Sequence, residues 1–520
     1  MRKLVNQKQM KEIERYAIEE IGIPSLVLME NAAKQFVDVM ENQLTHDDTI
    51  LVICGIGNNG GDGYAIARIL IDKGYRVDIC STGDPVNMTK ETRQQHEIIM
   101  KLNIPVLNDL AQVDFSTYSI LVDALFGIGL NRKLEEPYTE IIALINDSAG
   151  TVFAVDMPSG ASANNGEIMG TAVRADYTVT FSFEKIGQSL YPARDYCGEL
   201  IVVDIGIPHL ALANTATTYH TFDEKDLTML PKRQTHSNKG TFGKVLIIAG
   251  AENMSGAAFL AAKAAYRTGA GLVEILTPEA NRVILQTQLP EAILTTYDPE
   301  ALTEKSEIEK IKQTIRNADN VVIGPGIGTT EATHELLGLV TLYLTTPTVF
   351  DADAINLTAK YYNTFPMMRN NSCVRINELS NSLPAQSILT PHLKELARLL
   401  DRPVRDIQEN LLDIADSVTK DSDLIFVIKD ARTIVTSNSD RYINQSGNHG
   451  MATGGMGDVL TGIIAGLLVQ GTPPPKAAKL GVYIHGLAGD IAAKKVSSRS
   501  LLASDLIEAL GDVFKLAKDD

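Results

Sequence analysis

Three turns in the first half of the chain combine glycine with side chains that carry hard oxygen atoms. GIGNNGGDG contains Asn59, VDALFGIG contains Asp123, and VDMPSG contains Asp156 and Ser159. An amide carbonyl, a carboxylate and a hydroxyl suit a hard cation better than they suit zinc. Asn59, Asp123 and Ser159 are therefore candidate cation ligands if the fold makes them converge. Taken alone, each is more simply explained as the cap of the next helix.

The glycine turn at 55–63 follows an apolar run and precedes an amphipathic one. Such a turn lets the backbone pass close to a ligand, and the N-terminus of the following helix attracts anions. The turn is not the usual GxGxxG fingerprint, because Asn58, Asn59 and Asp62 add polar groups. The alternative is a tight turn from strand to helix that binds nothing.

The second half contains the most specific single motif of the chain, GGMGD, ahead of a long apolar run. Gly454, Gly455 and Gly457 at a helix start expose N–H groups that can hold the developing charge of a transferred phosphate. Asp458 lies at the same place and can accept the proton of an attacking hydroxyl. The alternative is an aspartate that caps a core helix.

Three further segments carry weaker signals at the ends of expected strands. KDART offers Lys429 to a nucleotide phosphate and Thr433 to an adenosine hydroxyl, GPGIG (324–328) is another glycine-rich exit, and TPH contains His392. A solvated strand end explains KDART equally well. A lone histidine is more often structural than functional.

The apolar pattern predicts the scaffold that would bring these segments together. Short apolar runs such as TILVICG (49–55) alternate with helix-like stretches such as 62–73, at the spacing of βαβ units. A second series starts at KGTFGKVLIIAG (239–250), and the last 65 or so residues have a helical period. The carboxyl ends of parallel strands share one edge, where ligands bind. The predicted fold class is α/β, with two doubly wound domains.

The polar stretch Thr215–Gln234 separates the two series. We predict one domain over residues 1–220 and a second over residues 230–520. Residues 358–388 show few ordered apolar periods, and we expect them to form a long surface loop.

In this order, GNNGGDG, VDALFGIG and VDMPSG resemble the NAD(P)H-hydrate epimerase family, over about residues 1–215. The resemblance implies a Rossmann-like domain and a potassium ion on Asn59, Asp123 and Ser159. It makes Asp156 the acid/base residue and offers Lys185 as a second catalytic group, for which an exposed surface lysine is the alternative. The substrate-binding residues that it implies are Asn58, Asn59, Gly60, Gly61, Asp62, Gly127, Ile128, Gly129, Leu130, Asn131, Arg132, Lys133 and Asp156.

KGTFGKVLIIAG, GPGIG, DADAIN, TPH, KDART and GGMGD resemble the ADP/ATP-dependent NAD(P)H-hydrate dehydratase family, a branch of the ribokinase-like fold, over about residues 236–510. The resemblance implies that Asp458 takes the proton of the C6 hydroxyl during phosphoryl transfer from a nucleotide bound with Mg²⁺. The hydrate would contact Ala257, Gly326, His392 and Asp458. The nucleotide would contact Lys429, Asp430, Ala431, Arg432, Thr433 and Gly457.

The chain departs from the dehydratase pattern at three places. Met456 stands where many members have a small residue, TPHLKE replaces TPHPGE, and Asp430 replaces a glycine. Met456 is large enough to crowd the glycine turn, and Asp430 adds negative charge near phosphates. Both departures bear on nucleotide affinity more than on the fold.

Together the resemblances predict a bifunctional repair enzyme that epimerises the R and S hydrates of NAD(P)H at C6 and dehydrates the S hydrate. The resemblance to bacterial fused forms implies ADP as the phosphate donor. One alternative is a ribokinase-like kinase of a vitamin precursor with a regulatory N-terminal domain, against which the retained substrate loops argue. Another is a non-enzymatic binding module, against which Asp156 argues.

Composition and charge narrow the classes of partner. The 520 residues carry a net charge of −17, which disfavours nucleic acid and anionic membranes. The four scattered cysteines (Cys54, Cys80, Cys197 and Cys373) predict reduced thiols rather than a disulfide scaffold. The N-terminal segment lacks the apolar core of a signal peptide, and no apolar run has the length of a membrane span. We expect a cytoplasmic homo-oligomer whose ligands are small molecules, NAD(P)H hydrates and ADP or ATP.

Overall fold

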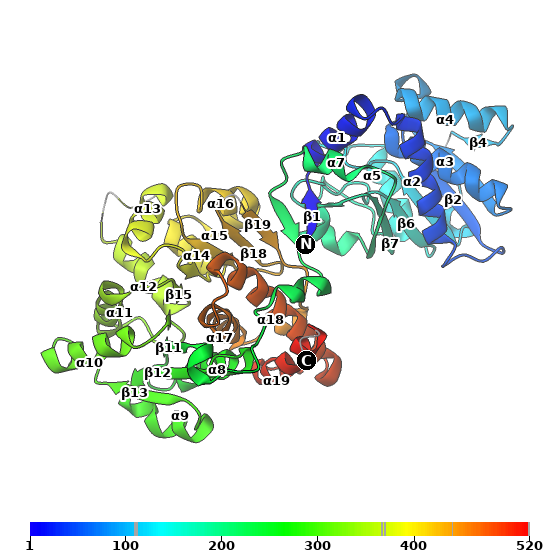
Figure 1. Cartoon of the computed structure of the whole chain (residues 1–520). Coiled ribbons are helices and arrows are strands. Elements are labelled where there is room, and N and C mark those ends of the chain that lie inside the picture. The colour runs from blue at the N-terminus through cyan, green and yellow to red at the C-terminus, as the bar shows by residue number, and fades with distance from the viewer. Residues whose placement is uncertain (109–112, 366–367, 369–370, 439, 518–520) are drawn as a thin grey trace. The chain divides into compact units, whose positions relative to one another are not determined.

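The structure, a computed structural model, describes residues 1–108, 113–365, 368, 371–438 and 440–517. The chain divides into two compact units, one over Lys3–Tyr219 and one over His220–Asp520 together with Met1–Arg2 (Figure 1). Within the described ranges, no helix is both long enough and apolar enough to cross a membrane. Cys54, Cys80 and Cys197 are buried free thiols and Cys373 is an exposed one, as expected for reduced cysteines.

The N-terminal unit contains an entirely parallel sheet of order β4-β3-β2-β5-β6-β7-β9. Its strands are β2 (Thr49–Cys54), β3 (Arg76–Ser81), β4 (Val106–Leu107), β5 (Ile120–Ala124), β6 (Thr151–Val155), β7 (Tyr177–Phe181) and β9 (Glu199–Val203). The chain runs outward from β2 to β4 and restarts at β5 on the other side of β2. The topological switch point therefore lies between β2 and β5, where ligands bind in doubly wound sheets.

Helices cover both faces of this sheet. They are α1 (Gln7–Arg15), α2 (Ser25–Met40), α3 (Asn58–Asp72), α4 (Lys90–Lys101), α5 (Tyr138–Asp147), α6 (Ile186–Ser189) and α7 (His209–Ala213). Val52 of β2 packs in one cluster with Phe36 of α2, and its neighbour Leu51 packs in another with Ile142 of α5. Because both faces are buried, the strand is apolar throughout, which is why TILVICG was recognisable as a strand.

A short parallel pair completes the N-terminal unit. β1 (Arg2–Val5) pairs with β8 (Glu184–Lys185), and Val5 is the partner of Lys185. Since α1 follows β1 within two residues, this pairing also brings α1 close to β8.

The strands of the C-terminal unit follow the order β13-β12-β11-β14-β15-β16-β17-β18-β19. They are β11 (Lys244–Ile248), β12 (Leu272–Pro278), β13 (Ile293–Tyr297), β14 (Asn320–Ile323), β15 (Thr348–Phe350), β16 (Ile388–Leu389), β17 (Ile425–Ile428), β18 (Ile434–Ser437) and β19 (Asp440–Ile443), with β10 (Tyr219–Thr221) at the boundary. From β13 to β17 the strands are parallel, and β18 and β19 continue as antiparallel strands.

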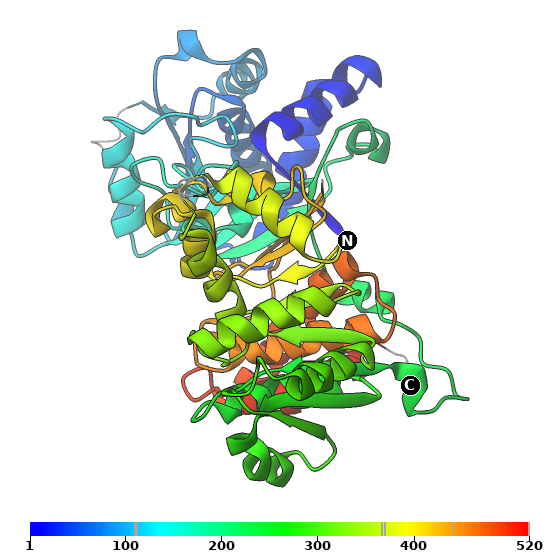
Figure 2. The same cartoon turned by 90° about the vertical axis from the view of Figure 1, so that its left-hand side faces the viewer.

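Helices again cover both faces, and Figure 2 views the C-terminal unit from the side of its green and yellow-green helices. They are α8 (Ser255–Thr268), α9 (Arg282–Gln288), α10 (Lys305–Arg316), α11 (Glu331–Tyr343), α12 (Asp353–Tyr362), α13 (Ser372–Ser382), α14 (Leu393–Leu400), α15 (Val404–Glu409), α16 (Leu411–Ser417), α17 (Met456–Val469), α18 (Pro474–Val496) and α19 (Ala503–Leu516). The last three confirm the predicted helical end of the chain.

The expectation of a long surface loop over residues 358–388 is wrong, because α12 ends and α13 lies within that range. Arg375 of α13 is 0% exposed. Its guanidinium donates to the carbonyl oxygens of Arg398 and Leu399 and to the carboxylate of Asp401. A buried charged side chain holds this segment in place of an apolar stripe. The apolar pattern of the sequence therefore did not reveal its helix.

Replacing Arg375 by Leu is expected to lower the free energy of unfolding of the C-terminal unit by about 3 kcal/mol, since buried carbonyl groups lose charged donors. Urea denaturation measures this change. Arg405→Leu removes an arginine whose side chain is 86% exposed in a surface pair and serves as the control. An unfolding midpoint that moves no further for Arg375→Leu than for the control would contradict the assigned role.

Candidate functional site

Asp123 and Ser159 lie in direct contact at the switch point of the N-terminal sheet, and both are fully buried. The Ser159 hydroxyl donates to Asp123 Oδ1 at 2.6 Å, and the Ser159 backbone N–H donates to Oδ2 at 2.8 Å. Burial raises the pKa of Asp123 to about 6, although the bonds from Ser159 lower it. Two of the three candidate cation ligands, from different strand ends, therefore meet.

Asn59, the third candidate ligand, lies in the first turn of α3 against the loop after β5. A Cβ atom on Gly127 would stand 3.0 Å from Asn59 Oδ1. Asn59 Nδ2 is buried and has no hydrogen-bond partner in the described part of the chain. The same side chain, turned over about its last bond, presents its amide oxygen at that position. A buried carboxylate, a hydroxyl and an unsatisfied amide fit a hard cation such as K⁺.

Asp156 follows β6 with a φ of 65°, in the left-handed region that residues other than glycine seldom adopt. Its Oδ1 atom accepts bonds from Thr180 Oγ1 at 3.0 Å, from the Phe181 N–H at 3.1 Å and from the Lys185 ammonium. Strain of this kind is commonly retained at functional sites. Lys185 is 0% exposed, so the alternative of a surface lysine is wrong.

The glycine turn after β2 is shaped partly by packing. A Cβ atom on Gly60 would stand 1.8 Å from the carbonyl oxygen of Gly55, so only glycine permits this backbone approach. Asn58 is exposed, whereas Gly60 and Gly61 are buried. In the predicted second substrate loop Leu130 is buried and Gly129 and Asn131–Lys133 are exposed. The turn thus serves the fold and also faces solvent beside the switch point.

In the C-terminal unit, Asp458 lies in the first turn of α17, after Gly455 with a φ of 89°. Burial raises the pKa of Asp458 to about 7, Asp351 raises it further, and Lys429 lowers it. A carboxyl group that titrates near neutral pH is well matched to accept and return a proton.

Lys429, directly after β17, lies beside the same glycine turn. Its ammonium donates to Asp351 Oδ1 at 2.8 Å, and a Cβ atom on Gly457 would stand 3.4 Å from it. Asp351 also accepts a bond from Thr390 Oγ1 at 2.6 Å. Burial works against the charge of Lys429, but Asp351 and Glu395 raise its pKa. The structure therefore holds a protonated lysine beside the glycine turn and the candidate base.

The other residues predicted to contact the hydrate lie at neighbouring strand ends. Gly326, with a φ of 61°, follows β14 and lies against Ala257, because a Cβ on Gly326 would stand 2.9 Å from the Ala257 Cβ. His392 follows β16 and caps α14, its Nδ1 accepting the N–H of Glu395 at 3.1 Å. Its side chain is 47% exposed, and its Nε2 atom lies 3.5 Å from Glu395 Oε1, so the same glutamate faces both ring nitrogens.

Lys429–Thr433 forms the turn between β17 and β18, since Ile428 pairs with Ile434. Asp430 and Ala431 are exposed in this turn, and Arg432 donates to the carbonyl oxygen of Gln445 at 2.5 Å. The expectation that Met456 crowds the glycine turn is wrong, because this side chain packs in the hydrophobic core of the unit.

Comparison with known proteins places both halves of the chain in described families. Residues 245–511 match the family described as NAD(P)H-hydrate dehydratase, and residues 25–187 match the family described as YjeF-related protein N-terminus. The bifunctional NAD(P)H-hydrate repair enzyme Nnr of Moorella thermoacetica is 35% identical to this chain and aligns with 99% of it and 97% of the relative. The chain belongs to the family of bifunctional NAD(P)H-hydrate repair enzymes. The Escherichia coli member is 34% identical over 96% of this chain and 91% of its own.

A ribokinase-like superfamily protein from Enterococcus faecalis, known from its crystal structure, covers 58% of this chain and 96% of its own. The TM-score is 0.50 at 28% identity. Membership of the NAD(P)H-hydrate repair family confirms both resemblances and the fold class of the two halves. It favours the enzyme hypothesis over a vitamin-precursor kinase or a binding module.

Sequence reasoning missed Glu14 of α1 in this member of the repair family. Burial raises the pKa of Glu14 to about 7, Asp156 raises it further, and Lys185 lowers it. Burial also raises the pKa of Asp62, with Asp156 and Glu14 adding to the effect. Asp156 thus raises the pKa of both Glu14 and Asp62, and the Lys185 ammonium opposes this effect on both. The available signal was the position of Glu14 four residues after the buried Met10, on the inward side of α1.

Asp351 was also missed as a site residue, although it begins the DADAIN motif. It is 1% exposed and accepts bonds from Lys429, Thr390 and Thr461. A carboxylate directly after a buried strand was the signal that would have identified it.

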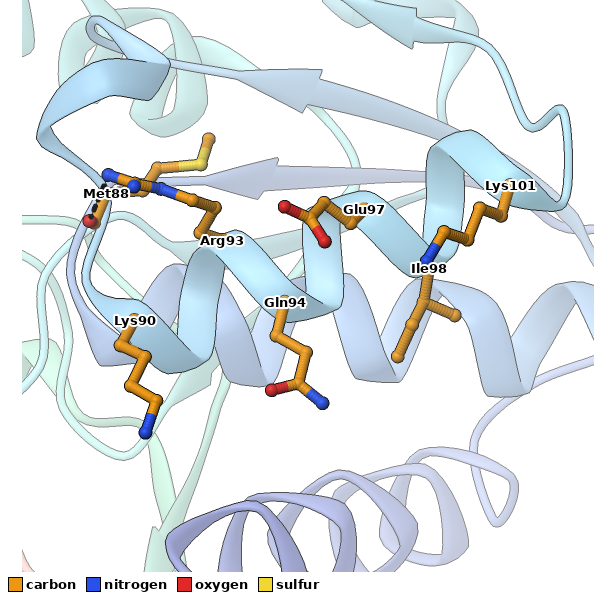
Figure 3. Close-up of a pocket in the computed structure, with 7 residues that line it drawn as sticks. All are labelled: Met88, Lys90, Arg93, Gln94, Glu97, Ile98 and Lys101. Atoms are coloured by element: carbon orange, nitrogen blue, oxygen red, sulfur yellow. Dashed lines mark hydrogen bonds between the residues drawn. The ribbon is translucent and has the colours of Figure 1, made fainter.

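A recess of about 550 Å³ on α4 lies apart from the candidate residues of the NAD(P)H-hydrate repair site (Figure 3). Its lining residues are Met88, Lys90, Arg93, Gln94, Glu97, Ile98 and Lys101. Figure 3 shows the lining side chains from Lys90 to Lys101 spread along α4, with Arg93 bonded back to the carbonyl of Met88, which precedes the helix. None of the candidate site residues lines this recess.

Proposed function

We propose that the chain repairs hydrated nicotinamide cofactors in two reactions. The N-terminal unit interconverts the R and S hydrates at C6, and the C-terminal unit converts the S hydrate to NADH or NADPH with ADP as phosphate donor. The observation that carries the proposal is the position of the Lys429 ammonium against Gly457 of the glycine turn, next to Asp458 at the start of α17. The names of the relatives agree with both reactions.

In the dehydratase reaction, Asp458 takes the proton of the C6 hydroxyl, and the hydroxyl oxygen of the hydrate attacks the terminal phosphate of ADP. Lys429 and the N–H groups of the glycine turn stabilise the charge that develops on the transferred phosphoryl group. The ring nitrogen then expels the C6 phosphate, and loss of the C5 proton completes the reduced ring. The products are the reduced cofactor, AMP and phosphate.

Mg²⁺ would neutralise the phosphate oxygens of ADP when it is bound. In the described part of the chain, no three His, Cys, Asp or Glu side chains cluster in a way that could hold a metal. The phosphates of the nucleotide itself would therefore supply much of the coordination, as is common for Mg²⁺ in phosphoryl transfer.

In the epimerase reaction, C6 must lose its tetrahedral geometry, either by loss of hydroxide or by opening of the C6–N1 bond. Both routes move a proton at the hydroxyl, and Asp156 is the group proposed to move it. Lys185 holds Asp156 Oδ1 through its ammonium, so the other carboxylate oxygen is left to face the substrate. Asn58–Asp62 and Gly127–Lys133 are the proposed substrate loops.

A potassium ion is proposed on Asn59, Asp123 and Ser159. When bound, it would supply positive charge beside the substrate loops and satisfy the buried amide of Asn59. Asp123, which is fully buried without a cationic partner in the described structure, would contribute the negative charge. Asn59 would link the ion to the glycine turn.

Crystals soaked in a rubidium salt are expected to show an anomalous peak in contact with Asn59, Asp123 and Ser159. Asp123→Asn removes the charge of the site but keeps its shape, and is expected to abolish the peak. Absence of the peak in the unmodified protein, with rubidium bound elsewhere in the same crystal, would reject the site.

The test of the two activities together is recovery of reduced-nicotinamide absorbance from a mixture of both hydrate epimers. With ADP and Mg²⁺, the whole mixture is expected to be converted, because epimerisation supplies the S hydrate. Conversion that stops when the S hydrate is consumed would contradict the epimerase, and no conversion would contradict the dehydratase. The homo-oligomer and the cytoplasmic location stay predictions.

A further inference from the structure

We propose that a pocket at the carboxyl ends of β12 and β13 binds the adenosine half of the hydrated dinucleotide and selects the substrate without a 2′-phosphate. The inference rests on the proposed function, because it assumes that the C-terminal unit takes a NAD(P)H hydrate. It adds a second binding region and a preference for the NADH hydrate over the NADPH hydrate.

The pocket has a volume of about 640 Å³. This volume falls in the range of about 300–1,000 Å³ that is usual for small-molecule sites. Its lining includes Ala251, Glu252, Glu279, Tyr297, Asp298 and Ile327. The residues come from segments that follow β11, β12, β13 and β14, which is the ligand-binding edge of a parallel sheet.

The order of strands separates this pocket from the expected ADP position, because the candidate catalytic residues lie between the two. Lys429 follows β17, His392 follows β16, Asp351 follows β15 and Gly326 follows β14. The nicotinamide ring must lie close to Asp458, next to Lys429. Since ADP is expected at the β17 end, the rest of the dinucleotide has room on the opposite side, toward β11, β12 and β13.

The pocket adjoins the residues proposed to contact the nicotinamide end. Gly326 is followed directly by Ile327, which lines the pocket. The N–H of Gly250 donates to the carbonyl oxygen of Pro325 at 2.9 Å and ties the two strand exits together. The next residue, Ala251, also lines the pocket. One continuous wall therefore runs from the nicotinamide position into the pocket.

The charged residues of the lining are Glu252, Glu279, Asp298 and Lys310. Lys310, and Arg282 beside the pocket, are already paired. Lys310 bonds Glu307 at 2.8 Å, and Arg282 bonds Glu279 at 2.6 Å. Glu252 and Asp298 are exposed and make no ion pair with any described residue. The pocket therefore presents uncompensated negative charge to a ligand.

This charge distinguishes the two cofactors. A carboxylate accepts hydrogen bonds from ribose hydroxyls, which is how many nucleotide sites prefer NAD over NADP. A 2′-phosphate carries between one and two negative charges and would be repelled by the same carboxylates. The unphosphorylated ribose is therefore the better fit.

The selectivity is tested by kcat/KM of the dehydratase for the two S hydrates, with saturating ADP. The wild-type protein is expected to favour the NADH hydrate by about tenfold, and the Glu252→Gln, Asp298→Asn double variant to bring this ratio close to one by improving the NADPH hydrate. Glu378→Gln, an exposed neutralisation on α13, is the matched control and is expected to keep the wild-type ratio. A ratio that the double variant leaves unchanged would overturn the assigned selectivity.

The location is tested by filling the pocket with Ala280→Trp, at an exposed lining residue. This variant is expected to raise KM for the NADH hydrate by about tenfold or more and to leave KM for the hydrate of reduced nicotinamide mononucleotide unchanged, because the mononucleotide lacks the adenosine half. An equal effect on both substrates, or no effect on either, would overturn the location. Failure of the proposed function would appear differently, as no turnover of either hydrate by the wild-type protein.

Discussion

Replacing Asp458 by Asn is expected to lower the rate of NADH release from the S hydrate by about 10²–10⁴-fold, or about 3 to 5 kcal/mol of barrier. Asparagine keeps the size of the side chain at the first turn of α17 but cannot accept the proton. ADP binding should survive, because Lys429 and the glycine N–H groups remain. Stopped-flow absorbance measures the rate, and calorimetry measures ADP binding.

The wild-type rate should also depend on pH in a way that the variant does not. The pKa of Asp458 lies near 7, so the fraction of active base increases as pH rises from 6 to 8. Asp413→Asn is the matched control, because Asp413 also lies in the first turn of a helix but is exposed. NADH release by Asp458→Asn at close to the wild-type rate would place the base elsewhere, with His392 as the next candidate.

Asp156→Asn is expected to slow interconversion of the R and S hydrates by about 10²–10⁴-fold. The variant keeps an acceptor for the Phe181 N–H and for the Lys185 ammonium, but it can no longer exchange a proton with the C6 hydroxyl. Dehydration of the S hydrate should be unchanged, since Asp458 belongs to the other unit. Chromatographic separation of the two epimers over time measures the rate.

Asp72→Asn, an exposed change near the end of α3, is the control for this experiment. It should leave both reactions unchanged. An epimer equilibration rate that Asp156→Asn does not alter would remove Asp156 from the chemistry and make Glu14 the carboxyl group to test next, since the two groups interact electrostatically.

Strand ends were predictable because parallel strands buried on both faces are continuous apolar runs. TILVIC and KVLII became β2 and β11, and the polar residues directly after such runs were placed at the ligand-binding edge. Asp123 and Ser159 lie 36 residues apart, and only the order of β5 and β6 in the sheet brings them within 2.6 Å.

The burial of individual charged side chains was not predictable in the same way. For Lys185 the sequence left a second catalytic group and a surface lysine both open, because its short strand has no apolar alternation, and the structure buries its ammonium against Asp156. Arg375 likewise lies in a segment without apolar period and is buried by bonds to carbonyl groups of α14 and Asp401. Burial of a charge depends on partners distant in sequence, which local pattern does not contain.

The sequence alone determined the α/β class and the motifs of the two halves, and it singled out Asp156 and Asp458 as candidates, because each depends on residue types next to a strand or helix end. The tertiary structure decided which groups share an environment. Glu14 joins Asp62 and Asp156, Asp351 holds Lys429, and an acidic pocket forms beyond Gly326. These placements follow from strand order and pairing, since long-range pairing alone brings charges from separate segments close enough to shift one another's protonation.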